Sequence, residues 1–154
     1  MAEYNAVVQW QRGDQVFTDN RYSRGHEWQF DGGVTVPASS SPHIVPLPYS
    51  VEQNVDPEEA FVAALSSCHM LFFLSYAAQA GFCVDQYTDM AIGTMGADNT
   101  GKTVMTSVVL KPDVQFVGKQ PDMSQLRALH DKAHHSCFLA NSVNFPVETE
   151  LSSE

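Results

Sequence analysis

One stretch of the sequence is long, apolar and free of charged side chains. From Ala60 to Gly81 the chain contains no aspartate, glutamate, lysine or arginine. The segment before it, Asp56-Pro57-Glu58-Glu59, places an N-cap, a proline at the first helical position and a capping-box glutamate in register. Gly81 is typical of a helix end. The sequence therefore predicts a long helix, from about residue 57 to about residue 80, that is buried almost all round.

A stretch of this length and composition also approaches what is needed to cross a bilayer. Polar side chains are dispersed through it, namely Ser66, Ser67, His69, Ser75 and Gln79. The nearest basic residues are Arg24 and Lys102, so the positive charges that anchor a membrane span are missing from both ends. We therefore expect the central helix of a soluble domain, without a membrane partner.

Burying such a helix on every side is difficult for a chain of this size. The 154 residues are enough for one domain, which we expect to cover residues 1–154, and one sheet covers only one face of a helix. A second copy of the chain would cover the rest. We therefore infer a homodimer in which the two central helices pack against each other through an apolar interface.

Short strands are predicted before this helix. Residues 4–10 and 16–18 indicate a hairpin around Arg12-Gly13-Asp14, and residues 27–30 and 34–36 indicate another around Asp31-Gly32-Gly33. Residues 38–49 are rich in serine and proline, which favours an irregular loop.

Strands and a second helix are predicted after it. Residues 86–95 and 103–117 resemble strands joined by a turn at residues 96–101, and residues 143–151 resemble a last strand. Asp122 and Gln125 form a capping-box pattern for a helix that should end near Cys137. This order of elements indicates an α+β fold rather than a regular βαβ repeat.

The net charge limits which partners the chain can bind, and the N-terminal residues and the cysteine count indicate its location in the cell. The formal net charge is −10, so nucleic acid and anionic membranes would be repelled. The N-terminal residues have neither a basic start nor an apolar signal core, which favours a cytoplasmic protein. Three cysteines are too few, and odd in number, for a secreted disulfide framework.

Each cysteine has an ordinary structural interpretation as well as a chemical one. Cys68 lies in the middle of the apolar helix, where a lone cysteine is usually core, and Cys83 is expected to pack in the core. Cys137 follows two histidines at a helix end. A metal site would use the set His69, His134, His135, Cys68 and Cys137. That spacing matches no zinc motif, and we expect neither a metal nor an organic cofactor.

Two segments resemble the hallmark segments of the OsmC-like superfamily, which includes the organic hydroperoxide resistance proteins. They are residues 56–61, followed by a cysteine ten residues after Glu58, and the later Ala133-His134-His135-Ser136-Cys137. The resemblance covers residues 56–145. It implies a β-sheet wrapped around a long buried central helix in an intertwined homodimer. It also implies that Cys68 is the peroxidatic cysteine, that Cys137 is the resolving cysteine, and that Glu58 orients an active-site arginine.

The expected position of the active-site arginine differs from that in one branch of this superfamily. Residues 45–55, where the OsmC branch carries it, contain no arginine or lysine. Arg21 and Arg24 resemble the N-terminal placement of the hydroperoxide resistance branch, and we favour Arg24, which lies next to a predicted strand. Ten helical residues separate Glu58 from Cys68 by roughly 15 Å. Glu58 would therefore act through a long arginine or across the dimer interface.

The activity implied by the resemblance is thiol-dependent peroxide reduction, an antioxidant function in the stress response. Cys68 would become a sulfenic acid on reaction with an organic hydroperoxide and then form a redox-active disulfide with Cys137. An external dithiol would reduce that disulfide. A non-enzymatic redox sensor or binding protein with the same fold stays open as an alternative, because it would keep both cysteines but show no turnover.

Overall fold

The computed structural model describes residues 1–152 of the chain. It divides into two compact units, the first ending at Ala60 and the second beginning at Phe61. The long helix α1 (Pro57–Gln79) begins in the first unit and continues in the second. The expectation of a single domain over the whole chain stays a prediction.

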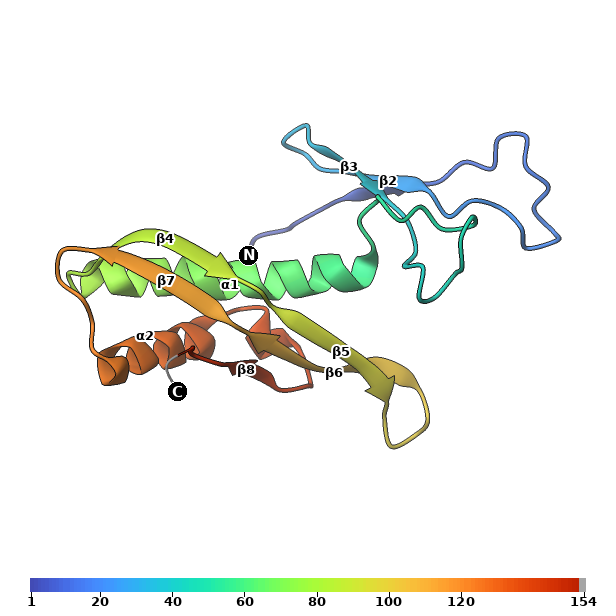
Figure 1. Ribbon diagram of the computed structural model, residues 1–154. Coiled ribbons are helices and arrows are strands. Elements are labelled where there is room, and N and C mark those ends of the chain that lie inside the picture. The colour runs from blue at the N-terminus through green and yellow to red at the C-terminus, as the bar shows by residue number, and fades with distance from the viewer. Residues whose placement is uncertain (153–154) are drawn as a thin grey trace. The chain divides into compact units, whose positions relative to one another are not determined.

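The first unit contains a three-stranded antiparallel sheet in the order β1 (Val7–Gln9), β2 (His26–Gln29), β3 (Thr35–Ala38) (Figure 1). The predicted hairpin around residues 31–33 is confirmed, and Gly33 has the positive φ of 95° that such a turn favours. The predicted hairpin around residues 12–14 is wrong. β1 pairs with β2 instead, and residues 16–18 form no strand.

Aromatic side chains explain why residues 10–25 form a loop. Trp10, Phe17 and Tyr22 pack against one another, with ring centroids 4.5 to 5.6 Å apart. These aromatic contacts join residues that are not paired in a β-sheet, and they stabilise the loop conformation relative to a local hairpin. The loop therefore folds around its own aromatic cluster. Residues 39–49 form no helix or regular strand, as predicted from their serines and prolines, whereas Ala38, which was included in the predicted loop, is the last residue of β3.

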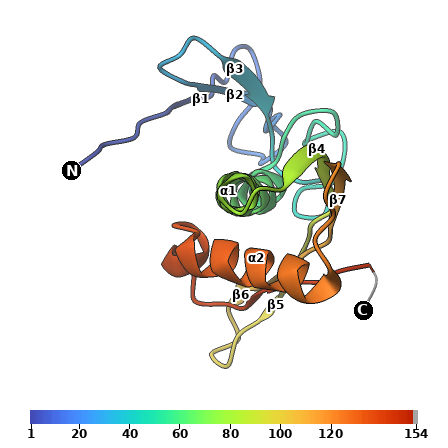
Figure 2. The same cartoon turned by 90° about the vertical axis from the view of Figure 1, so that its left-hand side faces the viewer.

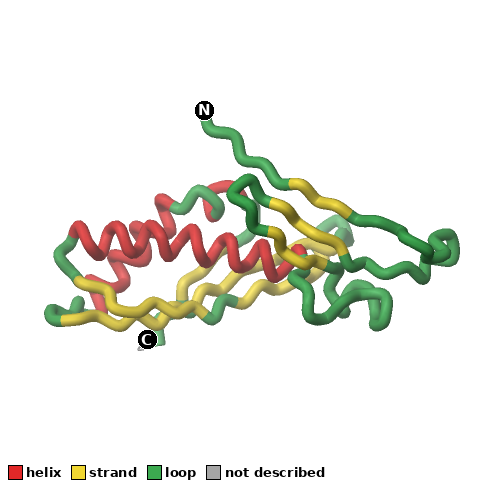
Figure 3. The backbone as a smooth tube through the Cα atoms, turned by 90° about the horizontal axis from the view of Figure 1, so that it is seen from above, coloured by secondary structure: helices red, strands yellow, loops and turns green. Residues whose placement is uncertain are grey.

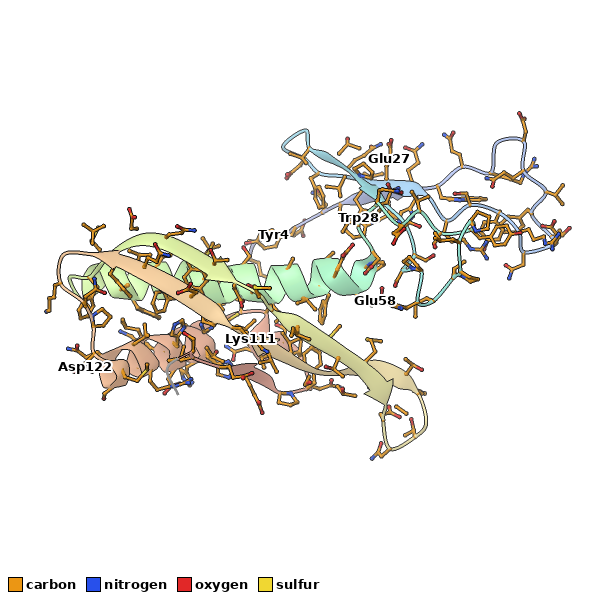
Figure 4. The ribbon with its side chains drawn as sticks, in the orientation of Figure 1. Tyr4, Glu27, Trp28, Glu58, Lys111 and Asp122 are labelled. Atoms are coloured by element: carbon orange, nitrogen blue, oxygen red, sulfur yellow. The ribbon has the colours of Figure 1, made fainter. Side chains whose placement is uncertain are left out.

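The start and the end of α1 are those predicted. The Asp56 carboxylate accepts a hydrogen bond from the Glu59 N–H at 2.8 Å, and the Glu59 carboxylate accepts one from the Asp56 N–H at 2.8 Å. Glu58 lies in the same first turn (Figure 4) and takes no part in this capping box. Gly81 follows the helix with a φ of 84°.

The second unit contains two small sheets. One pairs β4 (Cys83–Asp89) with β7 (Pro112–Val117), and the other has the order β5 (Ile92–Ala97), β6 (Thr103–Leu110), β8 (Val147–Thr149). β8 is parallel to β6, whereas the other pairs are antiparallel. β8 is shorter than the strand predicted over residues 143–151. The turn predicted at residues 96–101 joins β5 to β6.

Each of the two long strands predicted after α1 is divided in two. The reason is Asp89, whose carboxylate accepts hydrogen bonds from the Lys111 N–H at 2.6 Å and from the Ser66 hydroxyl at 2.5 Å. The Lys111 amide therefore points at a carboxylate rather than at a neighbouring strand. Lys111 lies at the junction of β6 and β7 (Figure 4).

One side of α1 forms the core of the second unit. Its buried residues are spaced four apart: Leu65, His69, Phe73 and Ala77. The first half packs on the β5–β6–β8 sheet, with Leu65 against Val108 and Leu110. The second half lies between the β4–β7 pair and α2 (Met123–Ser136), the helix with the predicted Asp122 and Gln125 capping box. Figure 2 looks nearly along α1 and shows α2 and β7 on different sides of it, and Figure 3 shows the helices running beside the strands.

The prediction that α1 is buried almost all round is wrong for the single chain. The sheets and α2 cover one side only, and Leu71 on the other side is 61% exposed. α1 is also the one helix among residues 1–152 that is long and apolar enough to cross a membrane by length and composition. Its packing against two sheets and α2 is the packing of a core helix.

Candidate functional site

Two cysteines from different helices meet in the second unit. Cys68 lies in the middle of α1, and Cys137 is the C-cap residue of α2. Both are free thiols, and the Cys68 side chain is close enough to contribute to the raised pKa of the Cys137 thiol. The packing of Phe73 on Leu129 and Ala133 holds the two helices together beside them. The fold therefore brings together the two thiols that the sequence singled out.

An open, apolar pocket lies over Cys68. Its volume is about 530 Å³. The lining residues are Ala64, Ser67, Cys68, Leu71, Phe72, Ser75 and Phe138. All except Phe138 come from one face of α1, because residues three and four apart share a face of a helix. Cys68 is thus a half-buried thiol at the surface of a pocket that suits an apolar molecule.

Cys137 has a different environment. It is 1% exposed, and its sulfur accepts a hydrogen bond from the Ala140 N–H at 3.4 Å, at the start of the 3₁₀ turn η1 (Ala140–Ser142). Burial and, to a smaller extent, the neighbouring Cys68 side chain raise the pKa of the Cys137 thiol to about 11, while the amides of Ala140 and Leu139 act in the opposite direction. Cys137 is therefore held as a neutral, shielded thiol.

His69, although next to Cys68 in sequence, faces the core. Its Nε2 lies 3.0 Å from Nδ1 of His130 on α2, and both side chains are 1% exposed. Burial lowers the pKa of His69 to about 4, with a further contribution from His134, and lowers the pKa of His130 to about 3. His134 and His135 are exposed. Within residues 1–152, no group of three or more His, Cys, Asp or Glu side chains could hold a metal ion.

The predicted arginines and Glu58 belong to the first unit. The Arg24 guanidinium donates to the backbone oxygen of Asn20 at 3.1 Å, to its side-chain oxygen at 3.0 Å and to the Tyr22 carbonyl. It also lies 3.7 Å from the centre of the Tyr22 ring. Arg21 is exposed, and Glu58 is half-buried. Because Cys68 lies in the other unit, a role for these three residues at the thiol stays a prediction.

Two features of this region could not be anticipated in the sequence. Cys83, expected in the core, is exposed at the first position of β4, because its neighbour Val84 takes the inward-facing position. The hydroxyl groups of Tyr76 and Ser136 are hydrogen bonded at 2.7 Å. The two residues are 60 positions apart, and no pattern in the sequence predicts their contact.

Comparison with protein families identifies the fold. The family model described as OsmC-like protein matches residues 51–152, which is more than half of the chain. This chain belongs to the OsmC-like protein family. The resemblance inferred from the cysteine segments is therefore confirmed, and so is the mixed α+β fold in which a long helix packs against sheets.

Solved structures give this OsmC-like chain several neighbours. An OsmC-like protein of unknown function from Vibrio cholerae is 57% identical, with a TM-score of 0.96 over 98% of this chain and 99% of that chain. An organic hydroperoxide resistance protein from Elizabethkingia anophelis is 17% identical, with a TM-score of 0.72 over 98% and 94% of the chains. The organic hydroperoxide resistance protein OhrB of Bacillus subtilis is 16% identical, with a TM-score of 0.64 over 98% of both chains. No curated protein matches this chain.

Proposed function

We propose that this chain is a thiol-dependent peroxidase that reduces organic hydroperoxides through Cys68 and Cys137. The observation that carries the proposal is the proximity of the two thiols beside an open apolar pocket, which is lined by Cys68 and by Phe138, the neighbour of Cys137. A disulfide forms when the two Cα atoms lie within about 7 Å of each other, and the proposal requires the two segments to approach to that distance. The organic hydroperoxide resistance proteins that share the fold support the same chemistry at the level of the family.

The reaction has two oxidative steps. The Cys68 thiolate attacks one oxygen of the hydroperoxide, the O–O bond breaks, and the alcohol leaves with a proton while Cys68 becomes a sulfenic acid. The Cys137 sulfur then attacks the Cys68 sulfur, the S–O bond breaks, and water leaves. An external dithiol reduces the disulfide through a mixed disulfide and is itself oxidised. The protein's own residues need no metal or organic cofactor for these steps.

An arginine is the proposed source of the charge that favours the Cys68 thiolate. Arg24 is the first candidate and Arg21 the second, and Glu58 would orient the guanidinium. The existing hydrogen bonds of Arg24 to Asn20 and Tyr22 leave part of its donor set for another partner. Arg24→Lys is the informative variant, because it keeps the positive charge and removes the planar guanidinium group, which can donate two parallel hydrogen bonds.

A homodimer is the proposed assembly, in the cytoplasm and without nucleic acid or membrane as partners. Support comes from the face of α1 opposite the core, where Ala64, Ser67 and Leu71 are exposed around the pocket. A second copy would remove this apolar face from water. Sedimentation equilibrium should therefore give twice the mass of one chain. A mass equal to one chain at micromolar concentration would contradict the homodimer.

Thiol stoichiometry tests the peroxidase proposal. One equivalent of an alkyl hydroperoxide should consume two of the three thiols of the reduced protein, and mass spectrometry should find the peptides of Cys68 and Cys137 joined. Excess dithiol should then support repeated turnover. A Cys83→Ser variant should behave like the wild type, because Cys83 is outside the pocket lining. A protein that is oxidised once and shows no turnover with any dithiol would be a redox sensor instead.

A further inference from the structure

The two residues that flank Cys137 are both attached to α1. Ser136 is hydrogen bonded through its hydroxyl to the Tyr76 hydroxyl at 2.7 Å. Phe138 places its ring edge-on against the Phe72 ring, with centroids 5.0 Å apart and planes at 89°. Because one residue on each side is held, the backbone of Cys137 has little freedom to move relative to α1.

The attachment points on α1 are in line with Cys68. Phe72 and Tyr76 follow Cys68 by one and two turns of the helix, on the same face. The contacts that hold residues 136 and 138 therefore also determine where the Cys137 sulfur lies relative to the Cys68 sulfur. α2 also holds Cys137, because the Cys137 N–H donates to the His134 carbonyl at 3.3 Å, although Cys137 itself has left the helical conformation with a ψ of 114°.

The Tyr76 ring is itself held in place. It stacks on Phe72 at a centroid distance of 6.3 Å, and the Lys132 ammonium lies 4.2 Å from its centre. These contacts involve the ring and not the hydroxyl, so they survive replacement by phenylalanine. The Tyr76 hydroxyl is thus presented to Ser136 from a fixed ring.

We propose that Tyr76 is a positioning residue for disulfide formation, which holds Cys137 through the Ser136 hydroxyl within reach of the oxidised Cys68. This inference rests on the proposed function. In the step concerned, Cys137 loses its proton, its sulfur attacks the Cys68 sulfur, and hydroxide leaves and takes up that proton as water. When the step is slow, a second hydroperoxide molecule can oxidise the sulfenic acid to a sulfinic acid and leave as its alcohol.

The lifetime of the Cys68 sulfenic acid tests this role. Reduced protein is mixed with tert-butyl hydroperoxide, quenched with dimedone at increasing times, and the Cys68 peptide is quantified by mass spectrometry. Tyr76→Phe and Ser136→Ala should each lengthen the lifetime by about threefold to tenfold, the range expected for one neutral hydrogen bond. The sulfinic fraction of Cys68 should rise, whereas the rate of the first oxidation should be unchanged.

Matched variants separate positioning from general loosening of the fold. Ser136→Thr retains the hydroxyl and should keep the wild-type lifetime. Gln79→Ala removes an exposed hydrogen bond from the Gln79 side chain to the Ser75 hydroxyl, one turn earlier on α1. It should also behave like the wild type. The double variant Tyr76→Phe with Ser136→Ala should be no slower than either single variant, because both remove the same bond.

The outcomes distinguish this inference from the proposed function. Wild type that forms no sulfenic acid and no disulfide would refute the proposed function itself. Wild type that forms the disulfide, with unchanged or shorter lifetimes in Tyr76→Phe and Ser136→Ala, would refute the positioning role alone. Equal slowing in Ser136→Thr and Ser136→Ala would also refute it, and this comparison holds even if Tyr76→Phe fails to fold.

Discussion

Replacement of Cys68 by serine is expected to lower the rate of dithiol-dependent hydroperoxide reduction by at least about a thousandfold, as for the loss of a catalytic nucleophile. A serine hydroxyl is not ionised near neutral pH, and it forms no sulfenic acid. Cys137 cannot take over the first step, because it is 1% exposed and burial raises its pKa to about 11. The measurement is consumption of an alkyl hydroperoxide with a dithiol in excess.

Cys137→Ser provides the contrast within the same assay. It should keep the first oxidation of Cys68 at the wild-type rate and accumulate sulfenic and then sulfinic acid, because the resolving thiol is missing. Cys83→Ser is the matched control, since it removes an exposed cysteine outside the pocket lining. A Cys68→Ser protein that retained a tenth of the wild-type rate would exclude Cys68 as the peroxidatic residue.

Acid is expected to destabilise the fold strongly through His69 and His130. In the folded chain their pKa values are lowered to about 4 and about 3 because both rings are buried. In the unfolded chain they should titrate near the ordinary value of about 6.5. The neutral rings therefore stabilise the fold fully above about pH 6.5, and this stabilisation is lost as the pH falls towards 4. Each histidine should contribute up to about 1.4 kcal/mol per pH unit.

Urea unfolding at about pH 7, 6 and 5 measures this slope. Replacing His130 by glutamine keeps a hydrogen-bonding side chain opposite His69 but removes one titrating group, so the slope of the unfolding free energy against pH should fall by about half. His135→Gln is the matched control on the same helix, because His135 is exposed. A His130→Gln protein with the wild-type slope would show that the buried pair does not cause the acid sensitivity.

Local signals in the sequence were sufficient for several elements. The capping boxes of Asp56 with Glu59 and of Asp122 with Gln125 place the starts of α1 and α2, and Gly81 marks the end of α1. The hairpin turn at residues 31–33 was also predicted. Each of these features depends on residues a few positions apart, whose preferences are nearly independent of the rest of the chain.

Contacts between residues far apart in the chain could not be predicted from such local patterns. The long strands predicted after α1 are divided because the Asp89 carboxylate binds Ser66 and the Lys111 amide. The hairpin predicted at residues 12–14 is replaced by an aromatic cluster. In both cases a tertiary interaction competes with a weak local preference and determines the outcome.

For the candidate site as well, some features could be predicted from the sequence and others depend on the tertiary structure. Cys68 and Cys137 could be chosen from the sequence, because their segments resemble those of one family. Their proximity, the apolar pocket over Cys68 and the Tyr76 to Ser136 contact arise only when α1 and α2 pack together. Sequence spacing determines which face of one helix a residue occupies. Only the packing of both helices decides which side chains on those faces meet, since that depends on the shape of the whole core.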